Sequence, residues 1–267
     1  MKLARYTGPI ERLGESVLAY VRATFELIGL FFSTMAGVVR GGRPRGEVVH
    51  QMYVIGNRSL IFVAVTLGFI GMVMIYQACL QFTKVTGDFS QVGVQFIRLI
   101  VSDFAPTLCG MMLATRVGAG IAAEIGSMKV TEQVDALRMS GVLPVDYLIV
   151  PRFLASVVMT VVLSVVGGAI MWIAGGLTAQ YSFHVNPALF YDMSLVRPIH
   201  LAMGLVKALS YGMAIPVVSG FCGLRAKGSS EGVGWATTSA VIGSSFAVIV
   251  LDFFWSMLGF LFFGASL

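Results

Sequence analysis

The chain has 267 residues, of which 57% are hydrophobic and 12% charged, and its formal net charge is +5. Ordinary globular domains carry roughly a quarter charged residues, so a soluble protein of this length could not hide so much apolar surface. The composition therefore excludes a soluble protein and indicates an integral membrane protein. Nucleic-acid binding is also excluded, because the basic residues are spread along the chain without a stripe or a motif.

The N-terminal segment, residues 1–58, is predicted to lie at a membrane surface. Over residues 10–28 apolar side chains recur with helical period, and the charged residues fall off that face. Such an amphipathic helix lies in the plane of the interface. The apolar stretch that follows, residues 27–39, is short compared with the ~20 residues that a crossing needs. Packing of this helix on other protein rather than on lipid is the alternative that the sequence leaves open.

Residues 59–267 are predicted to form one transmembrane domain of five helices. The apolar segments cover residues 60–82, 96–117, 154–181, 201–222 and 240–263. Each approaches the length that spans a bilayer. The expected fold is therefore an all-α integral membrane protein, in which an N-terminal interfacial amphipathic helix precedes five transmembrane helices.

The basic residues predict the orientation. Those before the first span or in the loops after the second and fourth spans are Lys2, Arg5, Arg12, Arg22, Arg40, Arg43, Arg45, Arg58, Arg116, Lys129, Arg138, Arg152, Arg225 and Lys227. The opposite side and the spans keep only Lys84, Arg98, Arg197 and Lys207. Since cytoplasmic loops carry the excess of Lys and Arg, the N-terminus is expected in the cytoplasm and the C-terminus on the far side.

The segment between the second and third spans is unusually charged. Its charged residues are Glu124, Lys129, Glu132, Asp135, Arg138, Asp146 and Arg152. Ser127 can cap a helix over residues 128–140, and Gly141 suits the position just past its end. Pro144 prevents the helix from continuing.

This predicted helix has one apolar stripe, formed by Val130, Val134 and Leu137. On other faces, Lys129 with Glu132 and Asp135 with Arg138 are spaced for i,i+3 ion pairs. A short amphipathic helix with both signs of charge suits a groove of another protein. A solvated loop helix that lies on the membrane is the alternative.

Small residues recur every fourth position at the end of the second span, as Gly110, Ala114, Gly118, Ala122 and Gly126. In the third span, Gly167, Gly168, Gly175 and Gly176 have the same character. Small residues allow close approach between membrane helices. The contact could lie within one chain or between two copies.

The charged segment, EIGSMKVTEQVDALRMSGVLPVDYLIVPRFLA, resembles the signature of the MlaE-type permeases. These proteins are the membrane subunits of ABC systems that move lipids with MCE-domain proteins. Further matching motifs are Gly71-Met72-Val73 with Gln77, Asp103-Phe104-Ala105-Pro106, Gly223-Leu224, Glu231-Gly232-Val233-Gly234, Ala236-Thr237-Thr238 and Asp252-Phe253-Phe254. The chain departs from the pattern at Trp235, where Arg is common, at Ser229-Ser230 in place of two glycines, and at Ala105 in place of Gly.

The resemblance implies a homodimer in the bacterial inner membrane that carries phospholipid between that membrane and the outer envelope. It implies two cytoplasmic ABC ATPase subunits, a periplasmic hexamer of MlaD-like MCE proteins, and a STAS-domain protein that often binds the ATPase. The chain is then a transport subunit and not an enzyme; it binds no cofactor itself, and ATP and Mg belong to the ATPase. The absence of a GxxxxGK[ST] sequence fits this role.

The predicted helix between spans two and three resembles the coupling helix that seats in the ATPase. The residues expected to couple are Ser127, Met128, Lys129, Glu132, Gln133, Asp135 and Arg138.

Ionisable residues inside the membrane are costly and usually face protein or water. Asp103 and Lys207 are therefore candidates for contact with lipid headgroups, with an internal salt bridge as the alternative. Met72, Tyr76 and Gln77 in the first span complete the candidate lipid pocket.

Other classes fit less well. The histidines and cysteines show neither a metal-binding spacing nor a nucleophile with its base, which argues against an enzyme or a metal site. A proton-coupled secondary transporter of a hydrophobic substrate remains the alternative, because intramembrane acids serve such proteins.

Overall fold

The computed structural model describes residues 9–41, 45–85, 89, 91–193 and 196–263. These residues form helices joined by turns and loops, and no strand occurs among them. The α-helices are α1 (Pro9–Arg40), α2 (Arg45–Met52), α3 (Arg58–Val85), α4 (Val92–Leu99), α5 (Ala105–Leu113), α6 (Ala119–Val130), α7 (Gln133–Met139), α8 (Val150–Phe183), α9 (Pro187–Phe190), α10 (Pro198–Leu224) and α11 (Ser230–Phe263). Lys2, Arg5 and Arg43 lie outside the described residues, as does the C-terminal end of the chain.

Short π-helical segments join several of these helices without ending them. They are η1 (Tyr53–Asn57), η2 (Ile100–Phe104), η3 (Ala114–Gly118) and η4 (Val145–Ile149). Through η1, helices α2 and α3 become one continuous rod that runs past residues 58 and 59. Through η2 and η3, α4, α5 and α6 likewise form a single rod.

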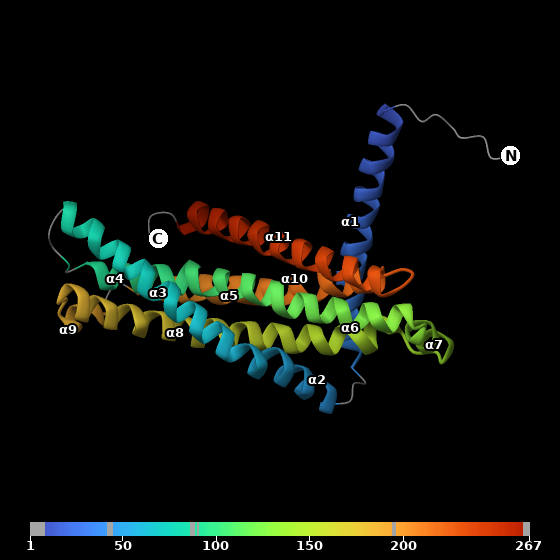
Figure 1. Ribbon diagram of the computed structural model, residues 1–267, viewed down its shortest axis with the longest axis horizontal. Helices are drawn as coiled ribbons and strands as arrows, with labels where there is room; N and C mark the ends of the chain where they lie inside the picture. The colour runs from blue at the N-terminus through green and yellow to red at the C-terminus, as the bar shows by residue number, and fades with distance from the viewer. Residues whose placement is uncertain (1–8, 42–44, 86–88, 90, 194–195, 264–267) are drawn as a thin grey trace.

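Five long rods run along the long axis of the molecule (Figure 1). They are Gly46–Lys84, Val92–Val130, Val145–Phe183, Pro198–Leu224 and Ser230–Phe262, all long and apolar enough to cross a membrane. The five predicted spans are therefore confirmed as helices. Four of them extend further at both ends than predicted, and the fifth begins about ten residues earlier, because helix formation continues into the polar sequence beyond the hydrocarbon core.

The N-terminal helix differs from its prediction. A single helix, α1, covers both the amphipathic stretch and the apolar stretch that follows, and its part Val21–Arg40 is also long and apolar enough to cross. Residues 27–39 thus belong to a longer apolar stretch, because the preceding turns add to its length, and the interfacial position of this helix stays a prediction. In Figure 1, α1 crosses the direction of the other rods at the end that carries α7.

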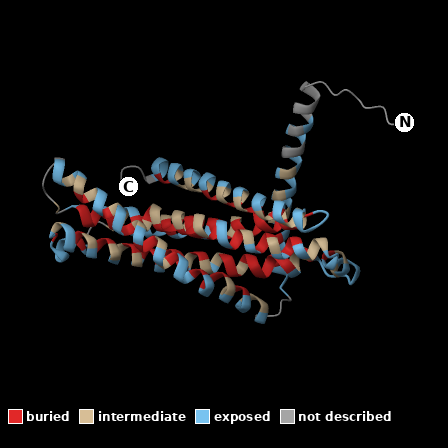
Figure 2. Ribbon diagram, in the orientation of Figure 1, coloured by how far each residue is buried: buried red, intermediate tan, exposed pale blue. Residues whose placement is uncertain are grey.

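The last turn of α1 fixes it to the bundle. A Cβ atom on Gly37 would meet the side chains of Asp146 and Val150, so this turn lies directly against η4 and the start of α8. Arg40 also approaches the Asp146 carboxylate, at 3.8 Å. Most of the remaining described surface of α1 is exposed (Figure 2).

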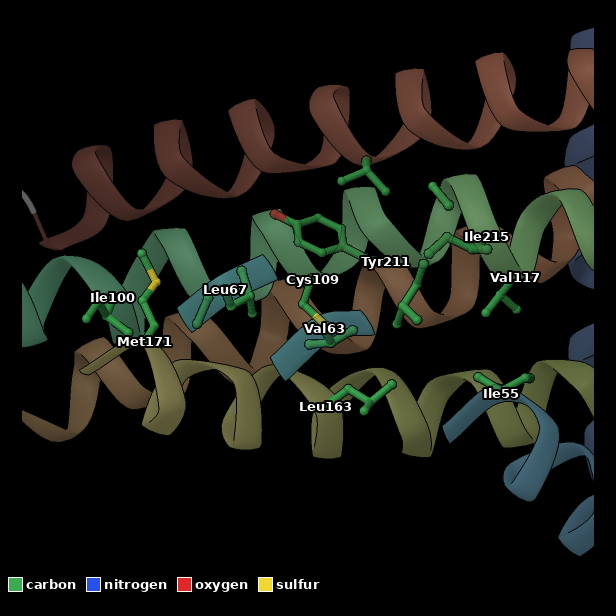
Figure 3. Close-up of a cluster of buried hydrophobic side chains, with 14 of the residues drawn as sticks. Ile55, Val63, Leu67, Ile100, Cys109, Val117, Leu163, Met171, Tyr211 and Ile215 are labelled. Atoms are coloured by element: carbon green, nitrogen blue, oxygen red, sulfur yellow. The ribbon is translucent and has the colours of Figure 1, made fainter. Parts of the chain in front are cut away.

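Helix α8 forms the centre of the bundle, with α3, α5 and α10 packed around it. One apolar core contains Leu163 and Met171 of α8 together with the buried side chains of Leu67, Ile100 and Ile215 from the surrounding rods (Figure 3). Helix α11 is mostly exposed by comparison, and it packs on α10 and α6 along one side only (Figure 2).

The small residues make contacts within the chain. A Cβ on Gly110 would lie 2.8 Å from the ring of Tyr211, and one on Gly118 would lie 3.0 Å from Ser219 Oγ. A Cβ on Gly168 would lie 2.9 Å from Ala105 Cβ. Because each position faces another helix of the same chain, the intrachain alternative is confirmed at these positions.

The contact between α10 and α8 gives a test of this packing. A Cβ on Gly212 would lie 2.8 Å from Val157 Cα and 3.1 Å from Ser156 O, which are backbone atoms that cannot rotate away. We expect Gly212→Ala to destabilise the protein by about 1–3 kcal/mol through overpacking. The measurement is the thermal unfolding midpoint in detergent. Gly234→Ala is the matched control, since a Cβ there meets nothing within 4 Å; equal midpoints for the two variants would contradict close packing at Gly212.

Candidate functional site

The polar turn between α6 and α7 is built differently from its prediction. Helix α6 runs through Ser127 to Val130, and the chain then turns at Thr131 and Glu132 before α7 begins. The prediction of one helix over residues 128–140 capped by Ser127 was wrong. The Ser127 carbonyl instead accepts hydrogen bonds from the backbone N–H and the hydroxyl of Thr131, at 3.0 and 2.9 Å. Glu132 adopts the left-handed conformation, φ 61°, which ends α6.

Asp135 holds this turn together. Its Oδ2 accepts a hydrogen bond from Lys129 Nζ at 2.7 Å, and its Oδ1 accepts one from Arg138 Nη1 at 3.3 Å. The predicted pair of Asp135 with Arg138 is confirmed. The predicted pair of Lys129 with Glu132 was wrong, because the break between the helices removes their i,i+3 relation. The hydrogen bond from Lys129 is the main cause that lowers the pKa of Asp135 below its ordinary value.

The end of α7 agrees with its prediction. Gly141 has φ +79°, and its N–H donates to Arg138 O at 3.0 Å. The N–H of Val142 donates to Leu137 O at 3.1 Å, which completes a glycine-ended cap of the Schellman type.

Helix α7 has one fixed face and one free face. Val134 is completely buried and anchors the helix, whereas Met139 is 90% exposed. Leu143 and Tyr147, which follow α7, are also exposed. Apolar side chains exposed beside charges mark surfaces that contact other proteins. The sequence did not predict these three residues as part of the site, because they lie outside the apolar stripe of Val130, Val134 and Leu137.

A second ion pair ties α6 to α8. Arg152 Nη2 lies 2.8 Å from Glu124 Oε1, and the arginine side chain is only 5% exposed. This ion pair connects the helix that leads into the α6–α7 turn to the central helix of the bundle.

Within the spans, the structure gathers a polar cluster of six residues from three helical rods. Its members are Asp103, Thr107, Lys207, Tyr211, Asp252 and Ser256. Each rod supplies two polar residues four positions apart, which places them on one helical face. This spacing was the sequence signal by which Thr107, Tyr211 and Ser256 could have been found.

Lys207 is the centre of the polar cluster. Its buried ammonium group pairs with Asp103, and its Nζ lies 2.9 Å from Asp252 Oδ1 and 2.8 Å from Ser256 Oγ. Tyr211 and Thr107 donate to the same Asp252 oxygen at 2.8 and 2.9 Å. Of the two alternatives for Asp103 and Lys207, contact with headgroups or an internal salt bridge, the structure shows the salt bridge. The Asp103 side chain nevertheless remains 44% exposed.

The other pocket candidates lie elsewhere. Met72, Tyr76 and Gln77 are exposed on α3, where the Tyr76 ring packs on Phe183 with 5.4 Å between centroids. The structure does not bring them to the polar cluster.

Two cavities adjoin the neighbourhood of Asp103. One, of about 180 Å³, is lined by Arg98, Leu99, Ser102, Asp103, Met203 and Ser256. The other, of about 280 Å³, lies between η2, α8 and α10 and has an almost wholly apolar lining.

The α6–α7 turn should depend on pH through Asp135. Because the folded pKa is lowered, the stabilisation is complete above the ordinary value of about 3.9 and is lost as pH falls through the lower folded value. Hydrogen exchange, corrected for its intrinsic pH dependence, should show amide protection in α7 falling only in that acid range. Asp135→Asn should remove the pH dependence; a variant that keeps it would assign the effect to another group.

The polar cluster should also contribute to stability. Lys207→Met leaves two carboxylates without their cation, so we expect a loss of about 3 kcal/mol, seen as a lower thermal unfolding midpoint in detergent. Lys84→Met, at an exposed lysine, is the control. Adding Asp103→Asn and Asp252→Asn to Lys207→Met should restore part of the loss; no restoration would mean that the charges are not the cause.

Comparison with known proteins agrees with this architecture. The family model described as "Permease MlaE" matches residues 48–258. A probable ABC transporter permease protein of Synechocystis is 34% identical over 240 residues, covering 88% of this chain and 90% of the relative. A probable ABC transporter permease protein of Rickettsia conorii is 30% identical, covering 90% and 93%. The intermembrane phospholipid transport system permease protein MlaE of Haemophilus influenzae is 30% identical, covering 91% and 94%. The chain belongs to the MlaE permease family.

Proposed function

We propose that this protein is the membrane subunit of an ABC system that transports phospholipid between the bacterial inner membrane and the outer envelope. The observation that carries the proposal is the α6–α7 turn, a charged and partly apolar surface held rigidly at one end of the membrane rods. The name of the Haemophilus relative supports the phospholipid cargo.

The proposed orientation places the end that carries α7 in the cytoplasm. Lys129, Arg138, Arg225 and Lys227 belong to turns at that end, so the positive-inside rule supports this direction. The N-terminus is then cytoplasmic and the C-terminus periplasmic. With α1 lying along the cytoplasmic surface, five rods cross the membrane.

The α6–α7 turn would bind the cytoplasmic ATPase, where ATP and Mg are held. Ser127, Met128, Lys129, Glu132, Gln133, Asp135 and Arg138 are the proposed coupling residues. Of these, Glu132 and Gln133 are exposed and free to contact a partner, whereas Lys129, Asp135 and Arg138 also shape the turn. ATP binding can shift the permease only if the ATPase binds this surface differently in its two states.

The proposed assembly is a homodimer with two ATPase subunits, an MCE-domain hexamer on the periplasmic side and a STAS-domain protein on the ATPase. The uncovered side of α11 supports a second copy as its partner, since large apolar residues such as Phe246, Phe253 and Phe260 are exposed along it.

The lipid would pass near the polar cluster. The cavity beside Asp103 has Arg98, Ser102 and Ser256 in its wall, so it offers charge and hydroxyl groups to a headgroup. The apolar cavity on the other side of η2 offers space for hydrocarbon. Met72, Tyr76 and Gln77 remain candidates for a lipid surface that a second copy would complete.

A proton-coupled secondary transporter is the second candidate. The buried Lys207 with two carboxylates favours it, because such groups relay protons in transporters. Transport by that mechanism would continue without an ATPase partner.

The test is Glu132→Lys, because Glu132 is exposed and forms no ion pair with any residue that the structure describes, so the turn keeps its internal bonds. Reversing this charge should disrupt docking and lower lipid-stimulated ATPase activity about tenfold in the reconstituted complex. The measurement is the ATPase rate together with transfer of labelled phospholipid in both directions. Asp135→Lys should lower the rate at least as much, because it also breaks the turn.

Glu15→Lys, at an exposed position near the start of α1, is the control and should leave the rate unchanged. An unchanged rate in Glu132→Lys would contradict the coupling role. Transport that persists without any ATPase would favour the proton-coupled alternative.

A further inference from the structure

A cavity of about 200 Å³ lies where the start of α3 faces η3 and α6. Its polar lining is formed by Gln51, Arg58, Ser59, Arg116 and Glu124. We propose that this cavity binds the phosphate group of an anionic membrane lipid. It is separate from the polar cluster, because Arg116 stands 13 positions beyond Asp103, or roughly 20 Å along the helix.

The cavity has positive charge available for a ligand. Arg58 and Arg116 are both exposed, and neither forms a salt bridge with any residue that the structure describes. The acidic member, Glu124, is already paired with Arg152 at 2.8 Å. Gln51 donates to Glu47 at 3.0 Å. Two unpaired guanidinium groups facing one cavity suit a phosphate, which accepts several charge-assisted hydrogen bonds.

Ser59 gives an independent indication. It is 0% exposed, and its Oγ has no hydrogen-bond partner. Several helical hydroxyls elsewhere in the chain donate to the carbonyl four residues earlier, as Thr83 and Ser102 do at 2.8 Å. Ser59 stands two residues after the π-helical segment η1, and the carbonyl four residues before it belongs to Ile55 within that segment. A buried hydroxyl without a partner is costly, so an acceptor in the cavity would satisfy it.

The position of the cavity along the membrane spans favours a lipid as the source of the phosphate. Arg58 directly precedes the first apolar span, and Arg116 stands at the end of the second, so both lie at the membrane boundary where lipid phosphates are found. The remaining wall is apolar, with Val54, Ile55 and Val117 among its residues. A free phosphate ion would make no favourable contact with this apolar wall, whereas the hydrocarbon of a lipid could pack against it.

Binding there would join two rods. A phosphate held by Arg58 of α3 and Arg116 of η3 would bridge the first rod to the one that continues into α6. The lipid would then stabilise the part of the bundle from which the α6–α7 turn extends.

The test measures lipid binding by the full-length chain in detergent, with native mass spectrometry during titration with phosphatidylglycerol. The double variant Arg58→Gln/Arg116→Gln should weaken binding at least tenfold, because both charge-assisted contacts are lost. Ser59→Ala, which keeps every charge, should weaken it about threefold. Thermal unfolding of each variant checks that the fold is kept.

The matched control is Arg40→Gln/Arg225→Gln, which removes the same charge at the same end of the molecule but outside the cavity. It should bind like the unaltered chain. Equal weakening by both double variants would overturn the proposal in favour of bulk charge attraction. Displacement of the lipid by inorganic phosphate at equal concentration would overturn the lipid as the source. These results do not depend on transport, so they stand or fall separately from the proposed function.

Discussion

Helices in a membrane gain little from contact between apolar side chains, because lipid tails are equally apolar. The rods of this protein are therefore held by two other means: backbones that approach closely at glycine, and polar groups that have no other partners at that depth. Gly110 and Gly212 let α5 and α8 come against α10, and Lys207 on the same helix joins it to Asp103 and Asp252. Helix α10 thus receives both kinds of contact and joins α5, α8 and α11, whereas α3 packs mainly on α8.

In the polar cluster, the buried ion pair that holds the helices together includes a carboxylate that is itself partly exposed. The Lys207 ammonium group is buried, but Asp103 keeps a large exposed fraction beside a cavity. A carboxylate held at one oxygen by a buried cation has its other oxygen available, and here that oxygen lies 3.2 Å from Ser102 Oγ. The salt bridge and a role in contact with a headgroup are therefore compatible properties of one residue.

Much of the fold could be predicted from the sequence, because length and hydropathy alone identify membrane helices. The five rods and the glycine that ends α7 follow from such local rules. The α6–α7 turn could not be predicted in detail, since one residue in the left-handed conformation, Glu132, ends α6 and changes every later pairing. The polar cluster needed tertiary information, because spacing indicates which residues share a face but not which faces meet.

The π-helical segments have a consequence for how this chain tolerates change in length. Each such segment holds one residue more than a regular turn, so removing a residue there would restore ordinary winding and leave the helix beyond it close to its present orientation. Removing a residue from a regular stretch would instead rotate everything beyond it by about 100°. Segments η2 and η3 stand on either side of α5 within a single rod, and they include Asp103 and Arg116 respectively. Compared with a regular helix of the same sequence, each of the two segments therefore changes the direction in which the side chains around it point. The change occurs once near Asp103 and once near Arg116, on either side of the apolar helix α5.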